Sequence, residues 1–446
     1  MGVGIEEAIS WLESHVNLET LDEGRYRIPT LDRISELCDL MANPQCAYPA
    51  IHITGTNGKG SVARMVSDLL TSAGLSVGTY TSPDLESLNE RLSFRGMKIQ
   101  SDELAQVLGS LRLLEPLMAE KPSRFEILTA AAFRWFADQA VDVAVIEVGL
   151  GGAWDATNIA NTSVAVITNI ELDHTEILGN SRIEIAREKA GIVKPDSVLI
   201  LGETDPELMG IFENAAHANG AQLWRKGENF ECESNIMAAN GRQLDLRVGD
   251  EVYSEVFLPL HGAHQGENAV MALAAACAFF GSDGAAGALS YDVVQEGLLQ
   301  VEVPARLEVI SRKPLVIIDG AHNPAGAHCA GAAVDEEFAM AQRRILITGM
   351  LKGRDPVSML EAFGSSSIDI VIACPAPSPR SISVGEIVSA AEALGIESMS
   401  TNSVADAVAI GIGIAEPEDL ILIAGSMYVA GAARTELLRL PYRLAG

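Results

Sequence analysis

Positively charged residues are scarce in this sequence of 446 residues. It has 31 Lys and Arg against 60 Asp and Glu, which gives a formal net charge of −29 at pH 7. Nucleic acids and anionic membrane surfaces are bound through basic patches, so this charge argues against both as partners. An anionic small molecule would have to be held by local positive groups against the field of the whole protein.

Cysteines are also few, and long apolar runs are absent. The six cysteines are scattered, with no CxxC pair, which favours reduced, buried thiols over a zinc site or a disulfide framework. The alanine-rich run 269–280 is too short to span a bilayer, and the first residues lack the basic segment and apolar core of a signal peptide. We therefore expect a cytoplasmic protein that does not bind membranes.

What the sequence does contain is enough apolar surface for two cores. Hydrophobic residues make up 48% of the chain, and 446 residues exceed the usual size of one core. Apolar segments alternate with helical patterns, which predicts α/β domains with doubly wound, mostly parallel sheets. We place the domains at 1–300 and 301–446, with a small antiparallel addition near 229–258.

The predicted strands are buried apolar segments of the kind found inside parallel sheets. They lie near 51–53, 77–83, 141–148, 164–168, 197–201, 315–319, 345–348, 368–372 and 420–424. The segment from Asp84 to Lys98 shows little periodicity and is predicted to be a functional loop. Ligands of such sheets bind at the carboxyl ends of the strands, where Gly55, Ser82, Glu147 and Asn169 fall.

A glycine-rich turn joins the first strand to a helix predicted at 61–70. The turn reads Thr54-Gly-Thr-Asn-Gly-Lys-Gly-Ser61. Backbone N–H groups and the positive end of a helix form a phosphate cradle there, in which Lys59 would reach the β- and γ-phosphates and Ser61 would hold Mg²⁺. The spacing is shorter than that of the common Walker A motif, and an ordinary strand-to-helix turn is the alternative.

A carboxylate ends the strand predicted at 141–148. Glu147 precedes the glycine-rich segment 149–152, at the position where a second Mg²⁺ ligand belongs in a phosphoryl-transfer site. The alternative is a charge that only marks the end of the strand.

The phosphate loop resembles that of the folylpolyglutamate synthase/dihydrofolate synthase family, which belongs with the Mur ligases that make amides at the expense of ATP. Further segments are similar to motifs of this family, in the same order along nearly the whole chain. These segments are Thr81-Ser-Pro83, Glu147-Val-Gly-Leu-Gly-Gly152, Glu188-Lys-Ala-Gly-Ile192, His264-Gln-Gly-Glu-Asn-Ala269, Pro304-Ala-Arg-Leu-Glu308, Asp319-Gly-Ala-His-Asn-Pro324 and Gly425-Ser-Met-Tyr428.

The resemblance implies a role for each matching residue. The implied catalytic residues are Lys59, Glu147, His174 and Lys189. The implied ATP-binding residues are Gly55, Thr56, Asn57, Gly58, Lys59, Gly60, Ser61, Asn268, Arg306, Asp319 and His322. The implied Mg²⁺ ligands are Ser61, Ser82, Glu147, His174 and Lys189, the last as a carbamate. The implied folate-binding residues are Phe125, Ala153, Trp154 and Asp155.

The implied reaction is the ATP-dependent addition of L-glutamate to a folate, and also to dihydropteroate, through an acyl phosphate. The implied cofactors are ATP and Mg²⁺. We expect a monomer. The chain departs from the family at Asp84, where many members have His, and at Ala153, where many have Arg. Both positions lie near the presumed folate pocket. Two alternatives follow: a Mur-type ligase with another acyl acceptor or amino acid, and a nucleotide-binding scaffold without catalysis.

Overall fold

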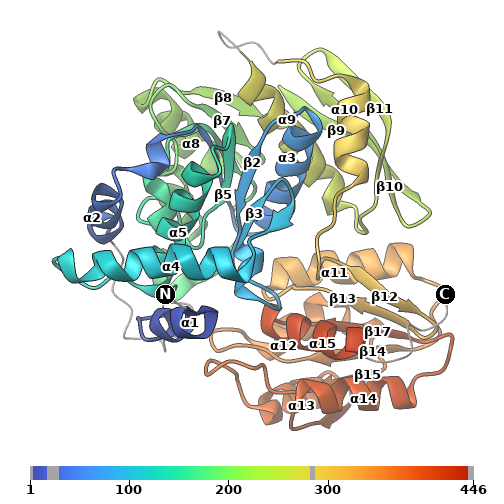
Figure 1. Cartoon of the computed structure of the whole chain (residues 1–446). Helices are drawn as coiled ribbons and strands as arrows, with labels where there is room; N and C mark the ends of the chain where they lie inside the picture. The colour runs from blue at the N-terminus through green and yellow to red at the C-terminus, as the bar shows by residue number, and fades with distance from the viewer. Residues whose placement is uncertain (1–3, 18–29, 282–286, 440–446) are drawn as a thin grey trace. The chain divides into compact units, whose positions relative to one another are not determined.

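The computed structural model of the chain describes residues 4–17, 30–281 and 287–439. The chain divides into two compact units (Figure 1). Unit 1 comprises the chain up to Ile236 together with Gln243–Leu258 and Gly266–Val301. Unit 2 comprises the chain from Glu302 onward together with two short earlier segments, Met237–Arg242 and Pro259–Gln265, which the sequence pattern did not assign to it.

Unit 1 is built on an eight-stranded sheet with the order β4-β3-β2-β5-β1-β6-β7-β8. Its strands are β1 (Ala50–Thr54), β2 (Val77–Tyr80), β3 (Leu92–Phe94), β4 (Met97–Lys98), β5 (Val143–Glu147), β6 (Thr162–Ile167), β7 (Val198–Leu201) and β8 (Gln222–Arg225). The strands from β2 to β8 in this order are parallel, while β3 and β4 add antiparallel pairs at the edge. The carboxyl ends of β1, β5 and β6 therefore meet at one edge.

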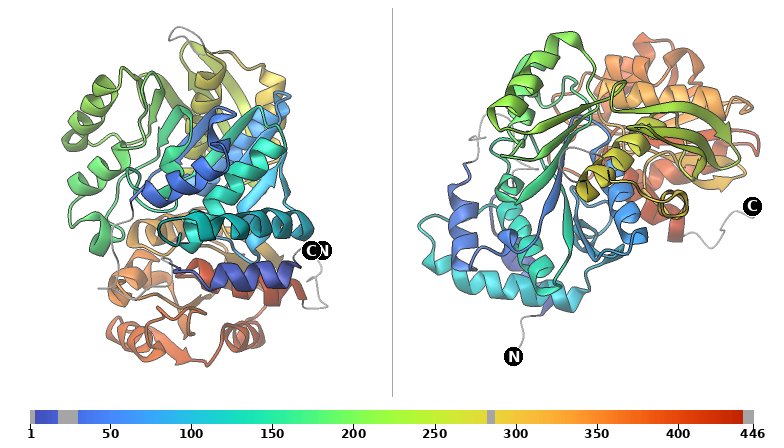
Figure 2. Two further views of the ribbon diagram at one scale, coloured as in Figure 1. Left: turned by 60° about the vertical axis from the view of Figure 1, so that its left-hand side comes forward. Right: turned by 90° about the horizontal axis from the view of Figure 1, so that it is seen from above.

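Helices cover both faces of this sheet (Figures 1 and 2). Side chains alternate between the faces along a strand. On β2, Gly78 lies against Phe136 of α5, whereas the hydroxyl of Thr79 bonds Ser67 of α3, 2.7 Å away. The helices described in this unit are α1 (Ile5–Glu13), α2 (Asp32–Leu40), α3 (Lys59–Ser72), α4 (Ser101–Leu114), α5 (Arg124–Asp138), α6 (Thr175–Leu178), α7 (Arg182–Ala190), α8 (Pro206–Ala218), α9 (His264–Phe280) and α10 (Tyr291–Leu299), with η1 (Pro44–Cys46), η3 (Glu115–Leu117) and η4 (Ala156–Ile159) as short 3₁₀ turns; α9 begins with two residues of unit 2.

The segment predicted as an irregular loop, Asp84 to Lys98, is partly regular, so that prediction was wrong. It contains the 3₁₀ turn η2 (Leu88–Arg91) followed by the hairpin of β3 and β4. Strands of two and three residues are too short for an alternating pattern to show in the sequence. The edge strand β8 was also missed, because only one of its four residues is buried.

The segment 229–258 forms a separate three-stranded sheet with the order β11-β10-β9. Its strands are β9 (Phe230–Ala238), β10 (Gly241–Val248) and β11 (Glu251–Leu258). Connections of two residues between consecutive paired strands make them antiparallel neighbours.

Unit 2 contains a six-stranded sheet with the order β12-β13-β17-β14-β15-β16. Only β12 and β13 pair antiparallel; the other pairs are parallel. Its elements are β12 (Glu308–Arg312), β13 (Leu315–Ile318), α11 (Pro324–Glu337), β14 (Arg344–Thr348), α12 (Pro356–Ala362), η5 (Ser365–Ser367), β15 (Ile370–Ala373), α13 (Val384–Ala393), β16 (Glu397–Ser400), α14 (Val404–Ile414), β17 (Leu420–Ala424) and α15 (Met427–Arg439). The predicted α/β class with mostly parallel sheets is confirmed; the edge strands β12 and β16 were not predicted.

Two expectations from composition meet the structure here. All six cysteines lie in the described ranges and none of them forms a disulfide. Burial holds only for Cys38, Cys277 and Cys374, while Cys46 is exposed. Across residues 4–17, 30–281 and 287–439, the helices all fall short of the length and hydrophobicity that a bilayer crossing requires.

Candidate active site

The phosphate loop has a backbone that only glycine allows at two positions. Gly55 has φ of +146° and Gly58 has φ of +86°, both in the region that side chains disfavour. A Cβ on Gly55 would lie 1.8 Å from Oγ1 of Thr168, and one on Gly58 would lie 2.6 Å from Oδ1 of Asn268. Helix α3 begins at Lys59, two residues earlier than predicted, so its first N–H groups face the turn.

The end of β6 holds the loop in place. The backbone N–H of Thr56 donates to the carbonyl of Asn169 at 2.9 Å, and the N–H of Asn57 donates to the Asn169 side-chain oxygen at 3.0 Å. The hydroxyl of Thr168 donates to the carbonyl of Asn57 at 2.6 Å. These contacts fix the loop without a ligand, which is the preorganisation that an anion site needs.

Two lysines converge on one carbonyl oxygen of the loop. The Lys59 ammonium donates to the carbonyls of Gly55 at 3.1 Å and Thr56 at 3.2 Å, and Lys189 of α7 donates to the same Gly55 oxygen at 2.8 Å. Burial, and next the positive charge of Lys59, lower the pKa of Lys189 to about 7. Lys189 is therefore a buried amine that loses its proton easily.

The carboxylate of Glu147 faces the beginning of α3. A Cβ on Gly60 would lie 3.5 Å from Oε2 of Glu147, and the backbone N–H of Ser82 donates to the same oxygen at 3.2 Å. Glu147 and Ser61 are both buried. The end of β5, the beginning of α3 and the loop after β2 thus meet at one carboxylate.

These donors fit the chemistry of Mg²⁺, which prefers carboxylate and other oxygen ligands. In the described part of the chain, no group of three or more His, Cys, Asp and Glu side chains is placed to hold a metal ion. The predicted set contains only two such side chains, Glu147 and His174. Its other members are Ser61, Ser82 and the carbamate of Lys189.

The ring of His174 lies near two carboxylates of its own segment. His174 precedes α6 with φ of +48°, and its ring lies 3.8 Å from a carboxylate oxygen of Asp173 and 3.9 Å from one of Glu176. Its role as an Mg²⁺ ligand stays a prediction.

The glycine-rich segment after β5 packs against the end of α7. A Cβ on Gly152 would lie 2.7 Å from the carbonyl of Glu188, and that carbonyl accepts the N–H of Ala153 at 3.0 Å. The N–H of Trp154 donates to the Glu188 carboxylate at 3.3 Å. Ala153 and Trp154 are half-buried. The segment therefore has to be small where it touches the turn that carries Lys189.

Two other residues predicted to bind folate have contacts of different kinds. Half-buried Phe125 lies over Gly149, whose added Cβ would come within 2.4 Å of the ring, and beside Tyr80 with 6.2 Å between ring centroids. Asp155 is buried, and its carboxylate accepts hydrogen bonds from the N–H groups of Leu150 and Thr157. Asp155 thus shapes its own loop.

The residues predicted in unit 2 cluster at the end of β13. The carboxylate of Asp319 accepts the N–H of Leu307 at 2.9 Å and that of Ala321 at 2.8 Å. Gly320 leaves room for Arg306, since a Cβ there would lie 2.1 Å from its Nη1. His322 lies 3.0 Å from the carbonyl of Gly320 through Nδ1.

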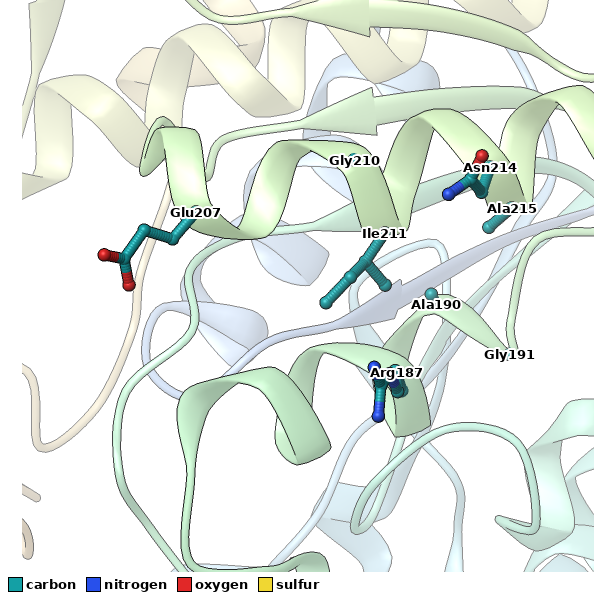
Figure 3. Close-up of a pocket in the computed structure, with 8 residues that line it drawn as sticks. All are labelled: Arg187, Ala190, Gly191, Glu207, Gly210, Ile211, Asn214 and Ala215. Carbon is teal, nitrogen blue, oxygen red and sulfur yellow. The ribbon is translucent and has the colours of Figure 1, made fainter.

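A cavity of about 520 Å³ lies between α7 and α8, outside these groups. Figure 3 shows Ile211 of α8 pointing toward α7, which carries Arg187. None of the residues that line the cavity was predicted as a site residue. They are Arg187, Ala190, Gly191, Glu207, Gly210, Ile211, Asn214 and Ala215.

The chain matches two family models and several named proteins. Residues 53–276 match the Mur ligase middle domain, and residues 305–427 match the Mur ligase glutamate ligase domain. A dihydrofolate synthase/folylpolyglutamate synthase of Mycobacterium tuberculosis is 40% identical over 442 residues, covering 91% of this chain and 90% of that protein. One from Escherichia coli is 32% identical, covering 94% and 93%.

The chain belongs to the folylpolyglutamate synthase/dihydrofolate synthase family of Mur ligases. The resemblance drawn from the motifs is thereby confirmed. A solved structure of this family, Mycobacterium tuberculosis folylpolyglutamate synthase complexed with ADP, aligns with a TM-score of 0.90 at 38% identity and covers 98% of this chain and 99% of that chain.

Within the family site, sequence reasoning missed the residues that hold the loops. Thr168, which supports the phosphate loop, follows β6 directly, and its position at the carboxyl edge of the sheet was the available signal. Arg91, which is fully buried and bonds Asp84, gave no signal, because a charged residue in a polar segment is normally exposed.

Proposed function

We propose that this protein is an ATP-dependent ligase that adds L-glutamate to a folate and also to dihydropteroate. The observation that carries the proposal is the preassembled turn between β1 and α3, with Lys59 at the helix start and Glu147 facing it. Relatives named for both synthase activities, and one complexed with ADP, support the same reading.

The turn would bind the phosphates of ATP. The N–H groups at the beginning of α3 would face the phosphates, whereas those of Thr56 and Asn57 are taken by Asn169. Lys59 would exchange the carbonyls of Gly55 and Thr56 for phosphate oxygens. We assign Mg²⁺ to Ser61, Ser82 and Glu147, with His174 and Lys189 as further ligands; there it would neutralise negative charge on the phosphates. We assign Thr56, Asn57, Gly60, Asn268, Arg306, Asp319 and His322 to ATP.

Two steps then form the amide. A carboxylate oxygen of the folate or dihydropteroate attacks the γ-phosphorus, and ADP leaves, which gives an acyl phosphate. The neutral amine of L-glutamate attacks the acyl carbon; the C–N bond forms, the amine loses a proton, and inorganic phosphate departs. Because phosphate is a far better leaving group than an oxide, the residues need only position and stabilise charge, with Lys59 foremost.

We propose that Lys189 is carried as a carbamate. Its neutral amine, favoured by the lowered pKa, would attack CO₂, forming a C–N bond and releasing a proton. The product is an anionic oxygen donor on α7 in place of a cation. Incubation with ¹³C-labelled bicarbonate should give one carbamate resonance by NMR that is absent in Lys189→Met. An unlabelled wild-type protein would contradict the assignment.

We expect the carboxylic acid substrate to bind against the half-buried side chains near the glycine-rich segment 149–152. We assign Phe125, Ala153 and Trp154 to folate contacts, and Asp155 to holding that segment in shape. We further propose a monomer in the cytoplasm. The charge of −29 supports the absence of nucleic-acid partners.

One assay tests the function. Purified protein is given ATP, Mg²⁺ and L-glutamate with either dihydropteroate or tetrahydrofolate, and the products are identified by mass spectrometry. We expect a glutamate adduct with each acid. Lys59→Ala should fold normally and lose glutamate-dependent ADP release by at least about 100-fold, whereas Lys121→Ala, which changes an exposed lysine, should keep it. Full turnover by Lys59→Ala would end the proposal.

The same assay separates the two alternatives. ADP release with other acid and amine pairs, but not with folates, would identify a Mur-type ligase for another substrate. Slow ATP hydrolysis in a single turnover, with no ligation product from any pair, would identify a nucleotide-binding scaffold.

A further inference from the structure

We infer that the ion pair of Asp84 and Arg91 positions Ser82 against Glu147 and so sets the affinity of the metal site. The inference rests on the proposed function only in that Ser82 and Glu147 are taken as Mg²⁺ ligands. Neither member of the pair needs to touch metal or substrate; both would act through the loop that carries Ser82.

Arg91 holds that loop on both sides of Ser82. The carbonyl of Arg91 accepts the backbone N–H of Thr81 at 3.0 Å, and its Nε donates to the carboxylate of Asp84 at 2.5 Å. Ser82 lies between these two attachment points. One residue therefore fixes the loop through its main chain and its side chain together.

We call Arg91 and its attachments to Thr81 and Asp84 the clamp. Arg91 is itself held in place by the neighbouring strands. Arg91 precedes β3 directly, and the first residue of β3, Leu92, pairs with Tyr80 of β2 in the antiparallel ladder. The turn before it is also tied, because the carboxylate of Glu90 accepts the N–H groups of Leu85 and Glu86. Movement of Arg91 would have to break the edge of the sheet.

Burial makes the charge pairing necessary. The Arg91 side chain is 1% exposed and that of Asp84 is 26% exposed. A guanidinium removed from water needs an anionic partner, and loss of that partner is strongly unfavourable. Without the Asp84 carboxylate, the Arg91 side chain would lose its attachment to the loop on the far side of Ser82.

The clamp leads directly to the metal site. The N–H of Ser82 donates to Oε2 of Glu147 at 3.2 Å, so a shift of the loop moves both proposed ligands relative to each other. Removing the outer partners of metal ligands typically weakens metal binding by about 10- to 100-fold. The clamp therefore gives a role to Asp84, which directly follows the Thr81-Ser-Pro83 motif.

The test measures metal binding without turnover. Mn²⁺ binding in the presence of ADP is followed by electron paramagnetic resonance for the wild type, Asp84→Ala, Asp84→Asn and the control Asp138→Ala, which breaks the exposed pair with Arg134. We expect about 10-fold weaker Mn²⁺ binding in Asp84→Ala, a smaller loss in Asp84→Asn, which keeps an acceptor oxygen, and none in the control. ADP binding in EDTA should stay unchanged, because only the metal ligands move.

Wild-type Mn²⁺ affinity in folded Asp84→Ala would overturn the inference. If Asp84→Ala does not fold, Asp84→Asn decides in the same way. Equal losses of Mn²⁺ and metal-free ADP binding would also overturn it, because they indicate general damage to the unit. Failure of the wild type to ligate glutamate to any folate would instead contradict the proposed function, while the shift in Mn²⁺ binding would still support the clamp.

Discussion

Single buried polar residues carry much of the local order around the site. His52, in the middle of β1, is fully buried, and its Nε2 lies 2.8 Å from the hydroxyl of Thr157. The backbone N–H of Thr157 in turn donates to Asp155, which shapes the segment after β5. A histidine under the phosphate loop thus links the first strand to the proposed folate segment.

This histidine makes the fold sensitive to acid. Burial, and next the positive charge of Lys194, lower the pKa of His52 to about 3, whereas an exposed histidine in the unfolded chain titrates near 6.5. Between these values the unfolded chain binds a proton that the folded chain does not, so stability is lost as the pH falls below 6.5. At pH 5 the loss from this group is about 2 kcal/mol.

Urea unfolding of wild type and His52→Gln at pH 7, 6 and 5 measures this loss. The wild type should lose more stability than the variant over this range, because glutamine takes up no proton. Replacement of the exposed His217 should leave the wild-type slope unchanged. Parallel slopes for wild type and His52→Gln would show that His52 does not titrate as stated.

At the scale of elements, the end of one helix anchors the two early segments of unit 2. Glu337, the last residue of α11, accepts hydrogen bonds from Arg242 at 2.9 Å and from the N–H of Gly262 at 2.8 Å, and lies 2.6 Å from His261. The Arg242 and Glu337 side chains are 2% and 3% exposed. One carboxylate therefore holds both the beginning of β10 and the segment before α9.

Breaking this buried pair should be costly. Glu337→Gln removes a buried anionic partner of the Arg242 guanidinium, and should lower the free energy of unfolding by about 3 kcal/mol. The double variant Arg242→Met/Glu337→Gln should recover part of the loss, since it leaves no buried charge without its partner. Chemical denaturation measures both.

The exposed pair Arg134–Asp138 provides the comparison. Arg134→Met should change the free energy of unfolding by less than about 0.5 kcal/mol. A loss in Glu337→Gln no larger than this would show that the anchor contributes little.

For the whole molecule, the central strands of the sheets could be predicted from sequence and the edge strands could not. Continuous apolar runs placed β5, β13 and β17, because strands buried on both faces need them. The edge strands β8 and β16 are short, and Trp224 is their only buried residue, so burial constrains few of their positions. These strands form because they hydrogen-bond to a neighbouring strand, and a single sequence does not reveal such pairing.

The site divides in the same way. Gly55, Lys59 and Glu147 were predicted because chemistry requires those residue types at strand ends. The attachment of Ser82 through Arg91 could not be predicted, because an Asp and an Arg seven residues apart in a polar segment are most often solvated. The sequence alone does not show which charged side chains the fold buries.

The carbonyl of Gly55, to which Nζ of Lys59 donates, affects how a nucleotide binds. Lys59 is already occupied, so an incoming triphosphate competes with the loop's own oxygen and gains less than it would from an idle cation. In return no loop has to be ordered when it lands. The phosphate loop is therefore preformed before the nucleotide binds. It gives up some affinity and avoids the cost of ordering on binding.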